Sequence, residues 1–167
     1  KQLGLTCYVY PGAQHTRFQH SLGALYLMTE AIKTLQNKGN DITKEEAEAV
    51  YAAIFLHDVG HGPFSHTLED FFYKDISHED IGISIIEKLN EELGGKLSLT
   101  ISILKNTYHK KFLHELVSGQ LDMDRLDYLR RDSFFTGVSE GNIGSARIIK
   151  MLNIKDGKLV VEAKGIY

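Results

Sequence analysis

The chain of 167 residues contains little cysteine, little proline and no tryptophan. Its single cysteine, Cys7, excludes an intramolecular disulfide and fits a reducing cytoplasm, the localisation that we expect. There is no long uninterrupted apolar run and no charged-then-apolar leader, so neither a membrane span nor secretion is predicted. A net charge of −3 gives no overall basic field, and nucleic-acid binding is therefore not indicated. The length suits one domain, residues 1–167, with a proper hydrophobic core.

Histidine, by contrast, is plentiful, with eight residues. The most informative set combines imidazoles and carboxylates from three separate segments: His20, His57, Asp58 and Asp124. Such mixed ligands suit one divalent cation, and iron, manganese, nickel, zinc, cobalt and magnesium are all candidates. A divalent ion can lower the pKa of a bound water to about 7 and can neutralise phosphate oxygens. The set therefore indicates metal-assisted phosphate hydrolysis.

Two capping boxes, Thr16–Gln19 and Thr43–Glu46, predict helix starts upstream of His20 and His57. The first helix would hold His20 in its first turn and turn an apolar stripe inward: Leu22, Leu25, Tyr26, Ile32 and Leu35. The second would bury Ala47, Val50, Tyr51 and Ile54, and the same step continues to His57, Asp58 and His61. These polar groups fall on the core-facing side where the helix ends, at Gly60, Gly62 and Pro63. Because unpaired burial is costly, they need a metal, a network or a cavity.

The overall pattern is mostly helical. Helices are expected near residues 16–37, 44–59, 78–93, 109–117, 119–132 and 146–152, with a loop over 136–145. Asp156-Gly157 predicts a tight β-hairpin within residues 151–163. Residues 97–103 alternate between apolar and polar side chains, which on pattern alone indicates a strand.

Each candidate residue also has an ordinary structural explanation. A lone histidine near a helix start is more often a hydrogen-bonded structural residue than a ligand. Asp124 with Tyr128, and Asp127 with Arg131, have the i,i+4 spacing of surface pairs. His78 falls on the stripe of Ile81, Ile85 and Leu89, so a satisfied core histidine is an equal alternative there. Taken together, the three segments favour a metal site.

Three motifs carry a family resemblance, and they lie at residues 2–23, 57–66 and 122–128. They read Q-L-G followed by Y-P-G-A and H-T-R-F-Q-H-S-L-G, then H-D-V-G-H-G-P-F-S-H, then D-M-D-R-L-D-Y. The chain resembles the HD-domain metal-dependent phosphohydrolases, most closely the deoxynucleoside triphosphate triphosphohydrolases of the SAM-and-HD type. The resemblance implies an HD-domain helical bundle with a helix, not a strand, over 97–103. It also implies hydrolysis of a dNTP at the α-phosphate to deoxynucleoside and triphosphate, through a metal-activated water, and a homo-oligomeric full-length protein.

The resemblance also implies roles for individual residues, matched by position. The metal ligands would be His20, His57, Asp58 and Asp124. The catalytic groups around the scissile phosphate would be His61, His66, Glu69 and His78, with His66 as the candidate general acid. The substrate contacts would be Arg17 and Arg125 on phosphates, Tyr128 beside the sugar, and Gln2 and Asp132 near its 3′ hydroxyl. The ordinary alternatives are packing for Tyr128 and a surface salt bridge for Asp132.

Two positions depart from the family pattern. Glu69 stands where the well-known nucleotide hydrolases of this type have Asp, and Arg125 stands where they commonly have Lys. Neither departure touches the predicted metal ligands, so both bear on substrate preference more than on reaction type. The chain also starts inside a family motif, from which we expect it to be a fragment of a longer polypeptide.

Other functions fit part of the pattern. An HD nucleotidase or phosphodiesterase acting on another phosphorylated substrate would use the same ligands. A module that binds nucleotide or metal without turnover is an alternative from another class. A zinc peptidase is a third, because His57 to His61 imitates the H-E-x-x-H pattern. That reading needs both histidines on one continuing helix and leaves His20 and Asp124 unused.

Overall fold

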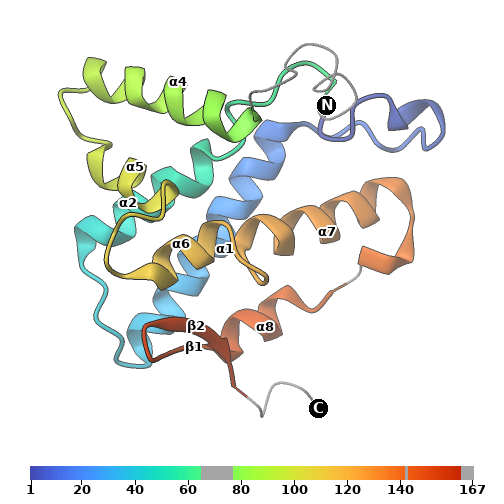
Figure 1. Cartoon of the computed structure of the whole chain (residues 1–167). Helices are drawn as coiled ribbons and strands as arrows, with labels where there is room; N and C mark the ends of the chain where they lie inside the picture. Colours follow the sequence, from blue (N-terminus) through green and yellow to red (C-terminus); the bar gives the residue numbers. More distant parts are fainter. Residues whose placement is uncertain (65–76, 142, 163–167) are drawn as a thin grey trace.

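The computed structural model describes residues 1–64, 77–141 and 143–162, most of which are helical (Figure 1). In chain order the elements are η1 (Thr6–Tyr8), α1 (Arg17–Asn37), α2 (Lys44–Leu56), α4 (His78–Glu92), α5 (Ser98–Leu104), α6 (Lys111–Val117), α7 (Met123–Thr136), η2 (Ser139–Gly141), α8 (Ser145–Met151), β1 (Leu152–Lys155) and β2 (Lys158–Val161). None of the described helices is both long enough and apolar enough to cross a membrane. The predicted mostly helical fold with a small hairpin is confirmed.

Helix α1 lies at the centre of the fold and contacts α2, α7, α8 and β1 (Figure 1). Both predicted capping boxes are formed. The Thr16 and Thr43 hydroxyls accept from the backbone N–H groups of Gln19 and Glu46, each over 3.2 Å. The Gln19 and Glu46 side chains accept in return from the N–H groups of the two threonines, each over 2.9 Å. These local bonds fix where α1 and α2 begin. The core packs around them and includes Met28, Ile32, Leu35, Val50, Ile54, Leu113, Leu116, Met123, Leu126 and Leu152.

The buried face of α1 differs from the predicted stripe. Leu22 and Tyr26 are 45% and 64% exposed, so the prediction that they point inward is wrong. The buried face is made instead of Ser21, Ala24, Leu27, Met28, Ala31, Ile32 and Leu35. On the side of α1 that meets α7, a Cβ atom at Gly23 would overlap Asp127 and Arg131, so the two helices approach closely there.

The start of α4 packs against the segment that follows α2. A Cβ atom added to Gly60 would overlap the backbone of His78 and Gly82, so the two segments touch backbone to backbone. Gly82 and Ile86 are the buried residues of α4, whereas Ile85 is 42% exposed. The predicted inward stripe through Ile85 is therefore rotated by about one residue. The contact brings His78 next to the end of α2.

The segment whose sequence alternates is helical. Residues Ser98–Leu104 form α5, which buries Thr100 and Ile103. The Thr100 hydroxyl donates to the carbonyl oxygen of Ala49 on α2 over 3.2 Å, so a buried polar residue is satisfied by a neighbouring helix. The strand indicated by alternation alone is wrong, and the helix implied by the family resemblance is confirmed.

The C-terminal hairpin forms as predicted. Strands β1 and β2 pair antiparallel, with Leu152 opposite Val161 and Lys155 opposite Lys158. The two turn residues, Asp156 and Gly157, both have positive φ, at 52° and 74°, as a two-residue type I′ turn requires. Several helix ends shift by a few residues: α2 ends at Leu56 instead of 59, and α7 begins at Met123 instead of 119.

Candidate metal centre

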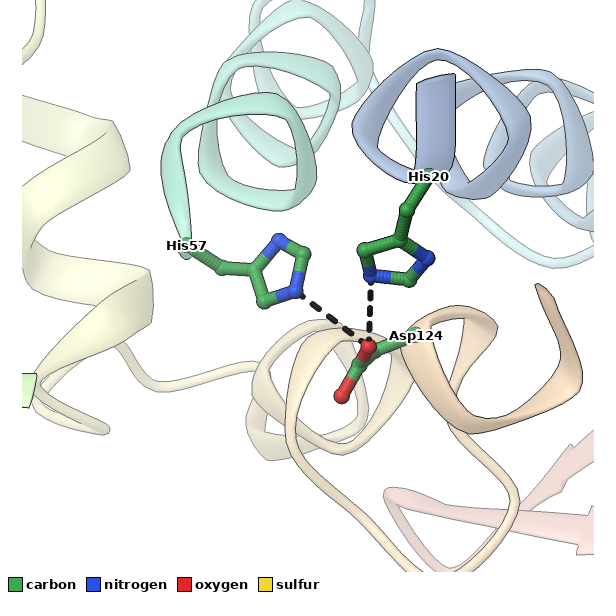
Figure 2. Close-up of side chains that lie close together, drawn as sticks. All are labelled: His20, His57 and Asp124. Carbon is green, nitrogen blue, oxygen red and sulfur yellow. Dashed lines mark ion pairs between the residues drawn. The ribbon is translucent and has the colours of Figure 1, made fainter. Parts of the chain in front are cut away.

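Three helices supply the residues of the candidate centre. His20 lies in the first turn of α1, His57 is the C-terminal cap of α2, and Asp124 lies in the first turn of α7. The start of α7 is fixed by Asp122, whose side chain accepts from the backbone N–H of Arg125 over 2.6 Å. Figure 2 shows both imidazoles pointing toward the same carboxylate oxygen of Asp124.

The geometry of this group suits a metal ion. Oδ1 of Asp124 lies 2.9 Å from Nε2 of His20 and 3.3 Å from Nε2 of His57 (Figure 2). One ligand atom from each residue lies within 4.8 Å of the others. Both Nε2 atoms are buried, and no group in the described part of the chain meets either with hydrogen-bond geometry. Two buried nitrogens and a carboxylate directed at one point are a donor set that a divalent ion would satisfy.

Asp58, the fourth predicted ligand, lies at the edge of this group. Its Oδ1 is 3.2 Å from Nε2 of His57, and its Oδ2 is 3.9 Å from Nε2 of His20. The same Oδ2 accepts a hydrogen bond of 2.7 Å from Nη1 of Arg17. The compact three-residue group does not include Asp58, although the carboxylate lies beside it. Arg17, the predicted phosphate contact, is thus bonded directly to a predicted metal ligand.

The outer nitrogen of each imidazole also has a partner. Nδ1 of His57 donates to the carbonyl oxygen of Ile54 over 2.6 Å. Nδ1 of His20 bonds to Oδ2 of Asp127 over 2.8 Å. A surface pair with Arg131 was the ordinary explanation for the spacing of Asp127, but Asp127 is only 7% exposed and also holds His20. The sequence carried one usable signal, because Asp127 follows Asp124 by three residues and shares its helix face.

The carboxylates change the protonation of the two imidazoles. Burial alone would lower the pKa of His20, but Asp124 and Asp127 outweigh it and raise that pKa to about 9. The pKa of His57 is also raised, because Asp124 and Asp58 outweigh the effect of burial. Burial acts to raise the pKa of Asp124, but the two imidazoles hold it well below its ordinary value. The carboxylate is therefore ionised, as a metal ligand must be.

A pocket of about 380 Å³ adjoins this group and contains several predicted catalytic and substrate residues. Its lining includes His57, Asp58, His61, His78, Asp124 and Arg125. The rings of His61 and His78 stack with centroids 3.9 Å apart, and Nε2 of His61 is 3.5 Å from Oδ1 of Asp58. His114, which the sequence did not single out, also lines the pocket and contacts the Ile103 carbonyl through Nδ1 over 3.0 Å. Predicted residues His66 and Glu69 lie outside the described residues.

Comparison with known proteins places this geometry in a family. The HD domain family matches residues 17–132, a stretch that contains the whole candidate centre. The chain belongs to the HD domain family. HD domains bind a divalent metal, and His20, His57 and Asp124 are positioned here to hold one.

Relatives of this HD domain include proteins of several organisms. The chain is 35% identical to the protein YwfO of Bacillus subtilis, covering 100% of this chain and 40% of that protein. It is 30% identical to the deoxynucleoside triphosphate triphosphohydrolase SAMHD1 homolog of Dictyostelium discoideum, covering 100% of this chain and 36% of that protein. A solved phosphohydrolase from Bacteroides thetaiotaomicron superposes with a TM-score of 0.97 at 68% identity, covering 100% of this chain and 41% of that one. The chain thus spans about two fifths of the length of each of these proteins.

The residues predicted near a sugar form a second polar group in this HD domain. Oδ1 of Asp132 lies 2.6 Å from Nε2 of His15, which is buried and stacks on Phe135 with ring centroids 4.6 Å apart. The backbone N–H of Gln2 donates to the carbonyl oxygen of His15 over 2.9 Å. Asp132 therefore bonds to a buried histidine, which differs from the surface salt bridge given as its ordinary alternative. Tyr128 is half-buried on the same helix.

Proposed function

We propose that this HD domain is a metal-dependent nucleotide phosphohydrolase that converts a dNTP to deoxynucleoside and inorganic triphosphate. The observation that carries the proposal is the convergence of His20, His57 and Asp124 on one point beside a pocket. Arginines at this site, Arg17 on Asp58 and Arg125 on the pocket wall, supply the positive charge that a polyphosphate needs. The similarity to the SAMHD1 homolog supports a deoxynucleotide substrate.

The proposed ligands are His20, His57 and Asp124, with Asp58 as the fourth. When bound, a divalent ion offsets phosphate charge and lowers the pKa of a coordinated water to about 7. The side chains orient these groups: Arg17 fixes the Asp58 carboxylate, and the outer nitrogens of both histidines are already engaged. Little reorganisation is then needed when the substrate arrives.

The proposed reaction breaks the bond between the α-phosphorus and the sugar O5′. Water oxygen joins the α-phosphorus, the triphosphate leaves with the added oxygen, and O5′ takes up a proton. His61 and His78 form one side of the pocket, and we assign them contacts with the scissile phosphate. His66 is the proposed proton donor to O5′, and Glu69 is its proposed neighbour in the same catalytic group.

The remaining substrate contacts are proposed from position. Arg17 and Arg125 would contact phosphates, and Tyr128 would lie beside the sugar. Gln2 and Asp132 would approach the 3′ hydroxyl, and their link through His15 supports a shared role. Because Asp132 already accepts from a buried histidine, one of its oxygens is held in place while the other can accept from a hydroxyl.

A zinc peptidase is not supported by this geometry. Helix α2 ends at Leu56, so His57 and His61 do not share a continuing helix. Nε2 of His57 is directed instead toward Asp124 on α7. His20 and Asp124, which a peptidase would leave unused, lie at the centre of the group.

Elemental analysis of the full-length protein, followed by a nucleotide panel with chromatographic separation of products, tests the proposal. One equivalent of a transition metal and release of triphosphate from dNTPs would support it. Release of single phosphates would assign the enzyme to the nucleotidases or phosphodiesterases. Tight nucleotide binding without product over long incubation would identify a regulatory module.

We also propose that the full-length protein is a homo-oligomer. Exposed aromatic side chains on α1 and α7 support this. Phe18 and Tyr26 on α1 are exposed, and Phe134 on α7 is 81% exposed. Light scattering during gel filtration would measure the mass of the full-length protein. A monomeric mass at all concentrations would contradict the proposal.

A further inference from the structure

A hydrogen-bonded chain runs from the partly exposed Arg131 of α7 to the buried outer face of His20. Nδ1 of His20 bonds to Oδ2 of Asp127 over 2.8 Å. Arg131 donates to both oxygens of Asp127, from Nε over 2.8 Å and from Nη2 over 2.9 Å. The His20 side chain is fully buried and that of Asp127 is 9% exposed. All three groups face one another across the α1–α7 contact.

Gly23 makes room for this chain. It lies one turn after His20 in the interior of α1, where glycine is costly to helix stability. A Cβ atom at this position would overlap both Nη2 of Arg131 and Oδ1 of Asp127. The Asp127–Arg131 pair therefore crosses α1 directly over the Gly23 backbone. The glycine has a packing reason that belongs to this pair and not to the apolar core.

The chemistry of the arrangement concerns the metal-facing nitrogen. A carboxylate that accepts from Nδ1–H fixes the tautomer in which Nε2 carries a lone pair, and it holds the plane of the ring. It also makes the imidazole a stronger donor. The two-pronged Arg131 contact fixes the carboxylate in turn, since the planar guanidinium leaves it one orientation.

We propose that Asp127 is a positioning residue that directs His20 at the metal, and that Arg131 and Gly23 hold it in place. The inference rests on the proposed metal centre but not on the identity of the substrate. A purely structural role for Asp127 would affect folding alone. A positioning role must also change how tightly and in what geometry the folded protein binds metal.

The test uses Co²⁺ with chelator-treated full-length protein and no nucleotide. Asp127→Asn keeps the shape and removes the charge, and we expect Co²⁺ affinity to fall about 10- to 100-fold. The visible absorption spectrum of the bound Co²⁺ should change as well, because it reports coordination geometry. Glu30→Gln is the matched control. It removes the charge from a surface ion pair with Lys33 on α1, and it should leave both the affinity and the spectrum unchanged.

Two further variants keep the test decisive if Asp127→Asn does not fold. Arg131→Lys keeps the charge but not the two-pronged contact, and Gly23→Ala displaces the pair by contact while both of its residues stay unmutated. Both are expected to weaken Co²⁺ binding, by less than the loss for Asp127→Asn. Affinities within twofold of the unmodified protein, with an unchanged spectrum, would overturn the inference even if thermal stability falls. That result would leave the hydrolase proposal standing, whereas a nucleotide panel without turnover would leave this inference standing.

Discussion

The two imidazoles of the centre are held by different means. The outer nitrogen of His57 donates to a carbonyl oxygen of its own helix, at Ile54. That of His20 bonds to a side chain of another helix, Asp127 of α7, which is itself fixed by Arg131. The partner of His57 is a backbone carbonyl, so replacing the side chain of the partner residue leaves that bond in place. Replacing the Asp127 side chain removes the bond to His20. The orientation of His57 thus depends on where α2 ends, and that of His20 depends on how α1 and α7 pack.

Asp124→Ala removes the carboxylate that both imidazoles share, and we expect it to have the largest effect on metal binding. Both imidazoles lose the carboxylate that they share, so the protein should purify without stoichiometric metal and without detectable turnover. Elemental analysis and the nucleotide assay measure the two losses. Glu91→Ala, on an exposed part of α4, is the control, and a fully loaded and active Asp124→Ala protein would contradict the assignment.

Asp58→Ala asks whether the centre needs a fourth ligand. We expect loss of bound metal and of turnover, because the remaining ligands leave the ion more weakly held and Arg17 loses its partner. The metal content after dialysis and the rate with added metal give the measurement. Full activity of a metal-depleted Asp58→Ala preparation would rule out the proposed mechanism.

The pH dependence of stability tests the protonation of the imidazoles without any metal, because folding raises the pKa of both. Folding raises the pKa of His20 from its ordinary value of 6.5 to about 9, so folding favours the protonated ring. This contribution is fully present below about pH 6.5 and is lost as the pH rises through 9. It amounts to roughly 3 kcal/mol, at about 1.4 kcal/mol per pKa unit.

Urea unfolding in the presence of a chelator, between pH 6 and pH 9.5, measures this loss. His20→Gln should reduce the pH dependence and leave the part that His57 contributes, whereas His109→Gln, at an exposed position, should keep all of it. The same slope in His20→Gln and the unmodified protein would show that the pH dependence arises elsewhere.

Thr43→Ala tests whether the orientation of His57 depends on α2 as a whole, and we expect it to have the smallest effect of these variants. It removes one half of a capping box, at a cost of about 1 kcal/mol in the free energy of unfolding. Because the cap lies at the far end of α2 from His57, metal affinity should not change. Thermal unfolding and Co²⁺ titration together check both expectations, and a large drop in affinity would mean that α2 as a whole fixes His57.

Local sequence signals predicted the parts of this molecule that local forces determine. Both capping boxes and the Asp156-Gly157 turn depend on neighbouring residues alone, and all three are formed as expected. The rotation of α1 could not be read in the same way. Leu22 and Tyr26 fit an apolar stripe, but the packing of α1 against its neighbouring helices buries another face.

The candidate site shows the same division. Motif and chemistry named the candidate ligands, and the structure brings three of them, His20, His57 and Asp124, close enough to hold one ion. The role of Asp127 was not predicted, because i,i+4 spacing with Arg131 describes a surface pair equally well and only the contact between α1 and α7 brings it to His20. The bond between His15 and Asp132 joins positions 117 apart in sequence, and no local pattern encodes such a pair.

The close approach of Gly60 and Gly82 has a consequence for the width of the pocket. No side chain lies between the two backbones, so nothing there can yield by changing its rotamer. A methyl group at Gly60 would overlap the backbone of His78 and Gly82, so it would push the beginning of α4 outward and separate the stacked rings of His61 and His78. The width of the pocket is thus set in part by a residue that has no side chain and lines no part of the pocket itself.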